Sequence, residues 1–203
     1  MPETSRRKQR SFWVELPILL IVAILVAVLV RTFLVQTFYI PSGSMETTLL
    51  INDRVLVNKI VYRFRDPRRG EVVVFVPPKE WDAGSKDDYI KRVVGVGGDR
   101  VVCCDSAGRI TINGRVLNEN YLYAGNAPSG IRFDVTVPTG RLFVLGDHRE
   151  ESADSRYHPT YQDGTIPVSA VVGRAFVIFW PFNHIASLSV PKGYSALPGP
   201  ADS

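Results

Sequence analysis

The feature that most constrains this chain is an apolar run near its N-terminus, uncharged from Leu16 to Val30. Its core is slightly shorter than the ~20 residues that a helix needs to cross a bilayer, but residues 33–35 extend it. No small-x-small cleavage site follows, so a removable secretory signal is excluded. We therefore expect residues 12–35 to form one uncleaved transmembrane anchor. A helix buried in a protein core is the alternative.

The charges before this run predict its orientation. Arg6, Arg7, Lys8 and Arg10, set against Glu3, supply +3 of the formal net charge of +4. Basic residues flanking a span stay in the cytoplasm, so residues 1–11 are expected to be a cytoplasmic tail of a single-pass cell-membrane protein, with the bulk of the chain extracytoplasmic. The rest of the chain is almost neutral and has no basic stripe for nucleic acid.

Beyond the anchor, short β-rich runs alternate with turn residues. Strands are predicted at 53–60, 71–76, 89–94, 131–137, 141–145 and 171–180, and residues 109–117 form a hairpin with Asn113-Gly114 at its turn. We expect a mainly β fold: an antiparallel sheet or barrel-like core from 36–100 and 141–185, and a smaller β insertion at 101–140. The Pro/Gly/Ser-rich segment 186–203 is expected to be disordered.

Metal or cofactor chemistry has no support in the sequence. The two cysteines, Cys103 and Cys104, are adjacent and lack a spaced partner for a metal site. The three histidines (His148, His158, His184) show no ligand spacing. We expect neither a metal nor a cofactor.

Two segments can carry hydrolytic chemistry. Residues 41–45, Pro-Ser-Gly-Ser-Met, can hold a hydroxyl on a preset turn, although an ordinary Ser/Gly loop has the same composition. In the strand at 89–94, Lys91 follows Ile90; if it points inward, burial lowers its pKa and a neutral amine can take a proton from a serine. Arg92 would then face outward. A lysine and an arginine at a strand's surface are the alternative.

A third segment, residues 146–156, is a dense polar loop that leaves the strand at 141–145. Asp154 and Arg156 are close enough in sequence to form a bidentate ion pair. Ser152 can hydrogen-bond a neutral lysine and orient it. A solvated surface loop is the alternative.

In order and spacing, four segments resemble the conserved boxes of type I signal peptidases, the membrane-bound serine proteases of family S26. They are residues 41–45, 52–59, 89–95 with Gly98-Asp99, and 146–156. The chain differs from that pattern at Thr47 and Gly97, where proline is common, and at His148, Glu150 and Glu151.

The resemblance implies a role for each site residue. Ser44 is the expected nucleophile and Lys91 the general base, while the Ser42 hydroxyl and the Ser44 N–H form the oxyanion hole. Ser152, Asp154 and Arg156 support the site. The residues expected to line shallow pockets for small side chains before the cut are Phe38, Ile40, Met45, Leu49 and Ile90.

The expected activity is cleavage of signal peptides from exported preproteins, at the outer surface of the lipid bilayer and with the export machinery as a further partner. Two alternatives stay open: a self-cleaving Ser/Lys protease of the repressor type, and a membrane-tethered β-domain that binds exported proteins without catalysis.

Overall fold

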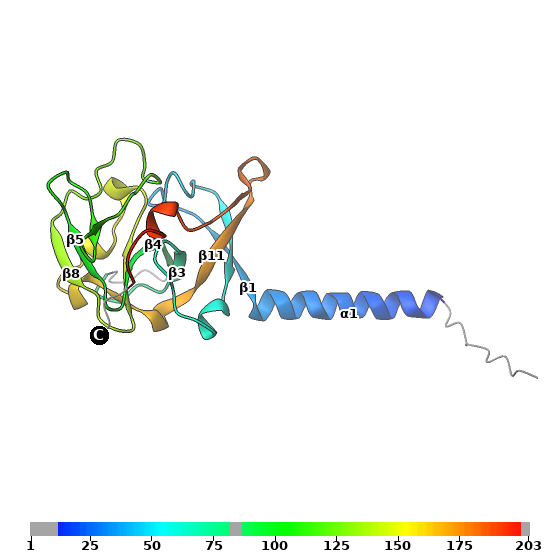
Figure 1. Ribbon diagram of the computed structural model, residues 1–203. Coiled ribbons are helices and arrows are strands. Elements are labelled where there is room, and N and C mark those ends of the chain that lie inside the picture. Colours follow the sequence, from blue (N-terminus) through cyan, green and yellow to red (C-terminus); the bar gives the residue numbers. More distant parts are fainter. Residues whose placement is uncertain (1–11, 82–86, 200–203) are drawn as a thin grey trace, which may run out of the picture.

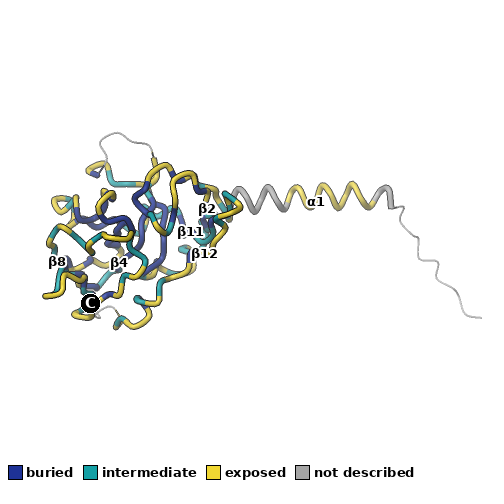
Figure 2. Tube along the Cα trace, turned by 90° about the horizontal axis from the view of Figure 1, so that it is seen from above, coloured by how far each residue is buried: buried dark blue, intermediate teal, exposed yellow. Residues whose placement is uncertain are grey.

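A computed structural model describes residues 12–81 and 87–199. Helix α1 (Phe12–Phe33) projects as a rod from a β-rich body (Figure 1). The side chains described in it, residues 15–25, are all exposed (Figure 2). Over the part of the chain that the structure describes, none of the helices combines the length and the apolar character that crossing a membrane requires. The expected tail 1–11 lies outside the described residues.

The helix ends two residues before the end of the segment 12–35 that was expected to form the anchor. The helix ends at Phe33, and Val35 already begins strand β1 (Val35–Tyr39). Val35 is paired with Asn58 of β2 (Arg54–Asn58), so its backbone belongs to the sheet ladder. Apolar character alone does not separate the end of a helix from the start of a strand.

The body is mainly β, as predicted, and is built on an open antiparallel sheet that curves into a half-barrel. Along the described chain this sheet has eight strands in the order β1-β2-β11-β3-β4-β9-β10, with β12 also paired to β11. Its other members are β3 (Val72–Phe75), β4 (Tyr89–Val96), β9 (Arg141–Leu145), β10 (Ile166–Pro167), β11 (Val171–Trp180) and β12 (Ala186–Ser187).

A smaller antiparallel sheet of four strands lies beside the half-barrel, in the order β7-β6-β5-β8 (Figure 1). The strands are β5 (Arg100–Cys103), β6 (Thr111–Ile112), β7 (Arg115–Val116) and β8 (Phe133–Thr136). The predicted hairpin turn is confirmed: Asn113 and Gly114 join β6 to β7 with φ of 51° and 75°. A disulfide joins the adjacent Cys103 and Cys104.

Short 3₁₀ turns connect the strands. They are η1 (Val61–Arg63), η2 (Arg149–Glu151), η3 (Ser155–Tyr157), η4 (Gln162–Gly164), η5 (Val168–Ala170), η6 (Phe182–His184) and η7 (Lys192–Tyr194).

The expectation of disorder over 186–203 is wrong for the described residues 186–199. Strand β12 pairs with β11, and the side chains of Leu188 and Tyr194 are buried among other protein atoms. The Tyr194 hydroxyl lies 2.7 Å from that of Tyr121. Composition predicted disorder because the segment is rich in proline and glycine, but strand pairing, buried side chains and hydrogen bonds to the β domain hold it in place. Residues 200–203 lie outside the described part.

Candidate active site

Ser44 lies on a tight turn that follows β1, and apolar side chains of the core pack against this turn. The Glu46 N–H donates to Gly43 O at 3.0 Å, and the Leu49 N–H donates to Met45 O at 2.8 Å. Met45 and Leu49 are fully buried in the core cluster under the turn. This packing holds the Ser44 side chain, 5% exposed, at the edge of the sheet.

Lys91 reaches this serine from β4. Its Nζ donates to Ser44 Oγ at 2.7 Å and to Ile90 O at 3.1 Å. Burial lowers the pKa of the Lys91 ammonium to about 8, although the charges of Asp154 and Asp147 act in the opposite direction. Lys91 is therefore neutral in a large fraction of molecules near pH 8, which a proton acceptor requires.

Ser42, whose hydroxyl was expected to form the oxyanion hole with the Ser44 N–H, lies beside the Ser44 side chain. The Ser42 Oγ lies 3.5 Å from Ser44 Oγ. Within the described residues, the Ser44 N–H has no hydrogen-bond acceptor. The Ser44 N–H can therefore bind a substrate oxygen, while the Ser42 hydroxyl donates to Ser44 Oγ in a long contact that it would have to exchange for one to the substrate.

Ser152 is beside the serine but does not make the expected contact with the lysine. Its Oγ is buried and has no hydrogen-bond partner among the described residues. It packs over Gly146, where an added Cβ would lie 2.2 Å from Ser152 Oγ and 2.4 Å from Ser44 O. Only glycine permits this approach of the two loops, a requirement that the sequence analysis missed although Gly146 opens the motif.

Arg92, next to Lys91 on β4, was expected to face outward and is instead buried. It points away from Lys91 and makes a bidentate contact with Asp147, Nε to Oδ1 at 2.8 Å and Nη2 to Oδ2 at 2.5 Å. Burial opposes the charged form, but the charge of Asp147 raises the pKa of the Arg92 guanidinium above its usual value. Asp147 also accepts a hydrogen bond from the hydroxyl of Thr48, which follows the turn that carries Ser44, at 2.5 Å.

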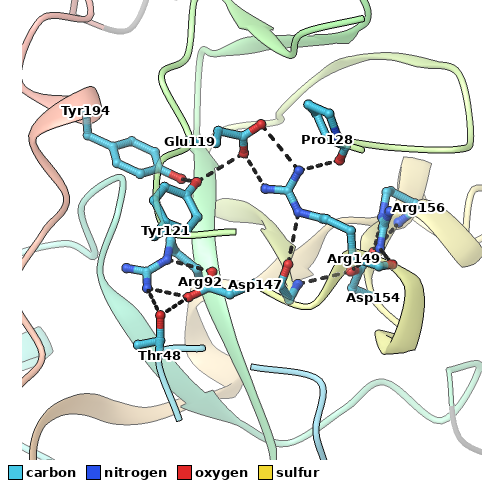
Figure 3. Close-up of polar contacts among 11 residues, drawn as sticks. Thr48, Arg92, Glu119, Tyr121, Pro128, Asp147, Arg149, Asp154, Arg156 and Tyr194 are labelled. Carbon is cyan, nitrogen blue, oxygen red and sulfur yellow. Dashed lines mark hydrogen bonds and ion pairs between the residues drawn. The ribbon is translucent and has the colours of Figure 1, made fainter. Parts of the chain in front are cut away.

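Two further buried arginines extend this network through the 146–156 loop (Figure 3). Arg149 binds the carbonyl of Pro128 and the carboxylate of Glu119, and both residues lie in the segment between strands β7 and β8 of the smaller sheet. Arg156 forms the bidentate pair with Asp154 that the sequence predicted, with both distances 2.8 Å. We call these three pairs, Arg92–Asp147, Arg149–Glu119 and Arg156–Asp154, the arginine network.

The five expected pocket residues divide into two groups. Ile90 lines the cleft that contains Ser44 and Lys91. The others do not line it: Ile40, Met45 and Leu49 are buried in the core cluster, and Phe38 packs against that cluster half-buried. Other residues line the cleft without having been predicted, namely Pro41, Asp87, Asp88, Tyr89, Glu151 and Ala153.

Nothing in the described part of the chain gathers three His, Cys, Asp or Glu side chains in a group that could hold a metal ion. An antiparallel β domain that presents a buried lysine amine to a serine hydroxyl has the make-up of a serine peptidase in which lysine takes the place of histidine.

Comparison with known proteins identifies the family of serine peptidases. Residues 13–180 match the family described as "Signal peptidase, peptidase S26". The "Probable signal peptidase I-2" of Synechocystis sp. is 42% identical, over 92% of this chain and 84% of that protein. The "Probable signal peptidase I" of Mycobacterium leprae is 36% identical over 93% and 84%. The "Signal peptidase I" of Mycobacterium tuberculosis is 36% identical over 88% and 76%.

The chain therefore belongs to the signal peptidase I family, the serine peptidases of family S26. This assignment decides against the repressor-type protease and the non-enzymatic binding domain that the sequence had left open.

Proposed function

We propose that Ser44 is the nucleophile and Lys91 the general base of a peptidase that removes signal peptides from exported preproteins. The observation that carries the assignment is the 2.7 Å contact from Lys91 Nζ to Ser44 Oγ inside a buried site. Among the described residues, no carboxylate is hydrogen-bonded to Lys91 Nζ, so no contacting anion holds the amine in its protonated form.

The reaction follows from these positions. Lys91 accepts the Ser44 proton while Oγ attacks the carbonyl carbon before the scissile bond, and the new oxyanion binds the Ser42 hydroxyl and the Ser44 N–H. Lys91 then gives the proton to the leaving amine, which departs as the mature protein. Water, deprotonated by the same lysine, hydrolyses the acyl-enzyme and restores the serine.

The remaining residues of the 146–156 loop serve as supports. We assign Ser152 to the packed floor beside Ser44, where it excludes water from the lysine. The pair Asp154–Arg156 fixes the loop, because Asp154 also accepts the Gly146 N–H at 3.0 Å.

An extended substrate has an open strand edge to pair with. In the described part of the chain, the ladder between β4 and β9 begins at Arg92, and the two residues before it, Ile90 and Lys91, line the cleft. Addition of a substrate strand there would place its carbonyl at Ser44. Ile90 forms an apolar wall, with Phe38, Ile40, Met45 and Leu49 packed behind it, and a shallow apolar site of this kind selects small side chains before the cut.

We further propose that the segment 12–35 anchors the enzyme in the cell membrane, with its N-terminus cytoplasmic and the β domain outside. The described helical side chains, among them Leu19, Leu20 and Ile21, are apolar and more than half exposed. An isolated apolar helix is unfavourable in water and favourable in lipid. Export machinery is then a natural neighbour, since preproteins reach the site across the same membrane.

The test is cleavage of a preprotein by detergent-solubilised protein, with the cut site read by N-terminal sequencing of the product. We expect wild type to cut once, after a small residue, and Ser44→Ala to leave the preprotein intact. Ser106→Ala, which changes an exposed serine in the turn between β5 and β6, is the matched control and should retain full activity. Equal cleavage by wild type and Ser44→Ala would refute the assignment.

A further inference from the structure

The C-terminal tail packs closely against the β domain and buries the side chain of Tyr194. That side chain lies in the core cluster that also contains the inward-facing residues of the smaller sheet. Just before it, a Cβ placed on Gly193 would lie 2.0 Å from Asn118 O, so the two backbones are in direct contact. Further along, the carbonyl of Pro198 accepts a hydrogen bond from Arg69 at 2.5 Å. The tail is therefore held on both sides of Tyr194.

The Tyr194 hydroxyl begins a chain of hydrogen bonds inside the protein (Figure 3). It lies 2.7 Å from the Tyr121 hydroxyl, which in turn donates to Glu119 Oε1 at 3.1 Å. A tyrosine hydroxyl carries one proton, and that of Tyr121 is directed to Glu119, so Tyr194 is the donor between the two tyrosines. Burial raises the pKa of the Tyr194 hydroxyl above its usual value, so this proton is retained at neutral pH.

The chain continues from Glu119 to the turn that carries the nucleophile. Glu119 binds Arg149, whose Nε donates to Gly146 O at 3.0 Å. Gly146 lies against Ser44 O, since a Cβ added to this glycine would be 2.4 Å from that oxygen. The N–H of His148 donates to the same oxygen at 3.2 Å. The backbone of Ser44 is therefore fixed by a loop that Glu119 and Arg149 hold in place.

Tyr121 also contacts neighbours of both reacting groups. The guanidinium carbon of Arg92, the residue after Lys91, lies 4.5 Å from the centroid of the Tyr121 ring. The backbone carbonyl of Tyr121 accepts from the hydroxyl of Thr47, three residues after Ser44, at 3.3 Å. A shift of Tyr121 would therefore displace residues next to the nucleophile and next to the base.

We propose that Tyr194 is a positioning residue for peptide cleavage, because its hydroxyl holds Tyr121 and thereby fixes the turn of Ser44. The inference rests on the proposed function. Among the described residues, the lining of the cleft that contains Ser44 and Lys91 includes neither tyrosine. Loss of either hydroxyl should therefore slow the chemical step, which needs Ser44 in place, and leave the binding of the preprotein unchanged.

The experiment removes the two hydroxyls singly and together, in the full-length protein in detergent with a preprotein as substrate. Tyr194→Phe keeps the buried ring and loses one hydrogen bond, so we expect kcat to fall roughly fivefold, with KM within about twofold of wild type. Tyr121→Phe loses two hydrogen bonds, and its kcat should fall roughly twentyfold. Tyr157→Phe changes an exposed tyrosine outside this chain of hydrogen bonds and is the matched control, expected to keep the wild-type kcat.

The double variant separates positioning through Tyr121 from an unrelated loss of stability. If Tyr194 acts through Tyr121, adding Tyr194→Phe to Tyr121→Phe should leave kcat within about twofold of that of Tyr121→Phe alone, because effects along one path do not add. Independent effects would instead multiply to roughly a hundredfold loss. Urea unfolding of the same proteins checks that each is folded under the assay conditions.

A wild-type kcat in Tyr194→Phe, a change confined to KM, or effects that multiply in the double variant would overturn the inference, while cleavage by wild type leaves the proposed function standing. Failure of wild type to cleave the preprotein would instead remove the proposed function, and the inference with it.

Discussion

Lys91 and Arg92 are consecutive residues on β4, almost equally buried at 5% and 2% exposed, yet their surroundings act on them in opposite ways. Arg92 faces Asp147 and is held as a cation, with its pKa raised. Lys91 faces a hydroxyl and a carbonyl, and burial lowers its pKa to about 8.

The difference shows that burial alone does not make a base. A buried cation with a contacting carboxylate is a structural brace, and one without such a carboxylate loses its proton. Consecutive side chains of a strand point to opposite faces. The amine of Lys91 therefore lies apart from the arginine network, although Arg92 is the next residue.

The largest effect is expected when Lys91 is replaced by arginine, the residue type of its neighbour Arg92. Lys91→Arg keeps a cation on the strand but removes the ability to lose a proton, so we expect kcat/KM to fall at least about a thousandfold, as for Lys91→Ala. Initial rates on a preprotein measure this, with Lys79→Ala as an exposed-lysine control. Activity of Lys91→Arg within tenfold of wild type would contradict a lysine base.

The complementary change deprives Arg92 of its anion. Asp147→Asn leaves a guanidinium buried without a negative charge, and the free energy of unfolding should decrease by about 3–5 kcal/mol. Urea unfolding followed by tryptophan fluorescence measures the loss. Replacing both partners, Arg92→Met with Asp147→Leu, should restore a large part of it; a loss below about 1 kcal/mol for the single variant would show that the pair is not needed.

A smaller effect is expected where the site binds the oxyanion. Ser42→Ala removes one donor, which typically costs about 100- to 1,000-fold in kcat. Because the interaction forms in the transition state, KM should change little. A change confined to KM would place Ser42 in ground-state binding instead.

The smallest effect distinguishes Ser152 from these groups. Its hydroxyl makes no hydrogen bond within the described structure, so Ser152→Ala should lower kcat/KM less than about tenfold. A loss beyond a hundredfold would show that Ser152 contacts Lys91 in the working enzyme, as the sequence had led us to expect.

The sequence was informative where local pattern determines structure. The alternation at 53–60 and the Asn113-Gly114 turn predicted β2 and the β6–β7 hairpin, and the order of the motifs placed Ser44 and Lys91 in one site. These features depend on neighbours in the chain or on a family resemblance.

What the sequence did not show depends on contacts between distant segments. The buried Arg92 is paired with Asp147, the need for glycine at 146 arises from Ser152 and Ser44, and Tyr194 in the tail contacts Tyr121. Periodicity and composition carry no information on such pairs, which form only once the sheet is assembled.

The central claim is that Lys91 is a neutral amine at working pH because it is buried without a bonded carboxylate. The most direct test is an NMR titration of the full chain in detergent, with lysine labelled at Cε and the Lys91 signal assigned by its absence in Lys91→Met. The account predicts a pKa of about 8. A pKa near 10.4, the value of a lysine in water, would contradict it.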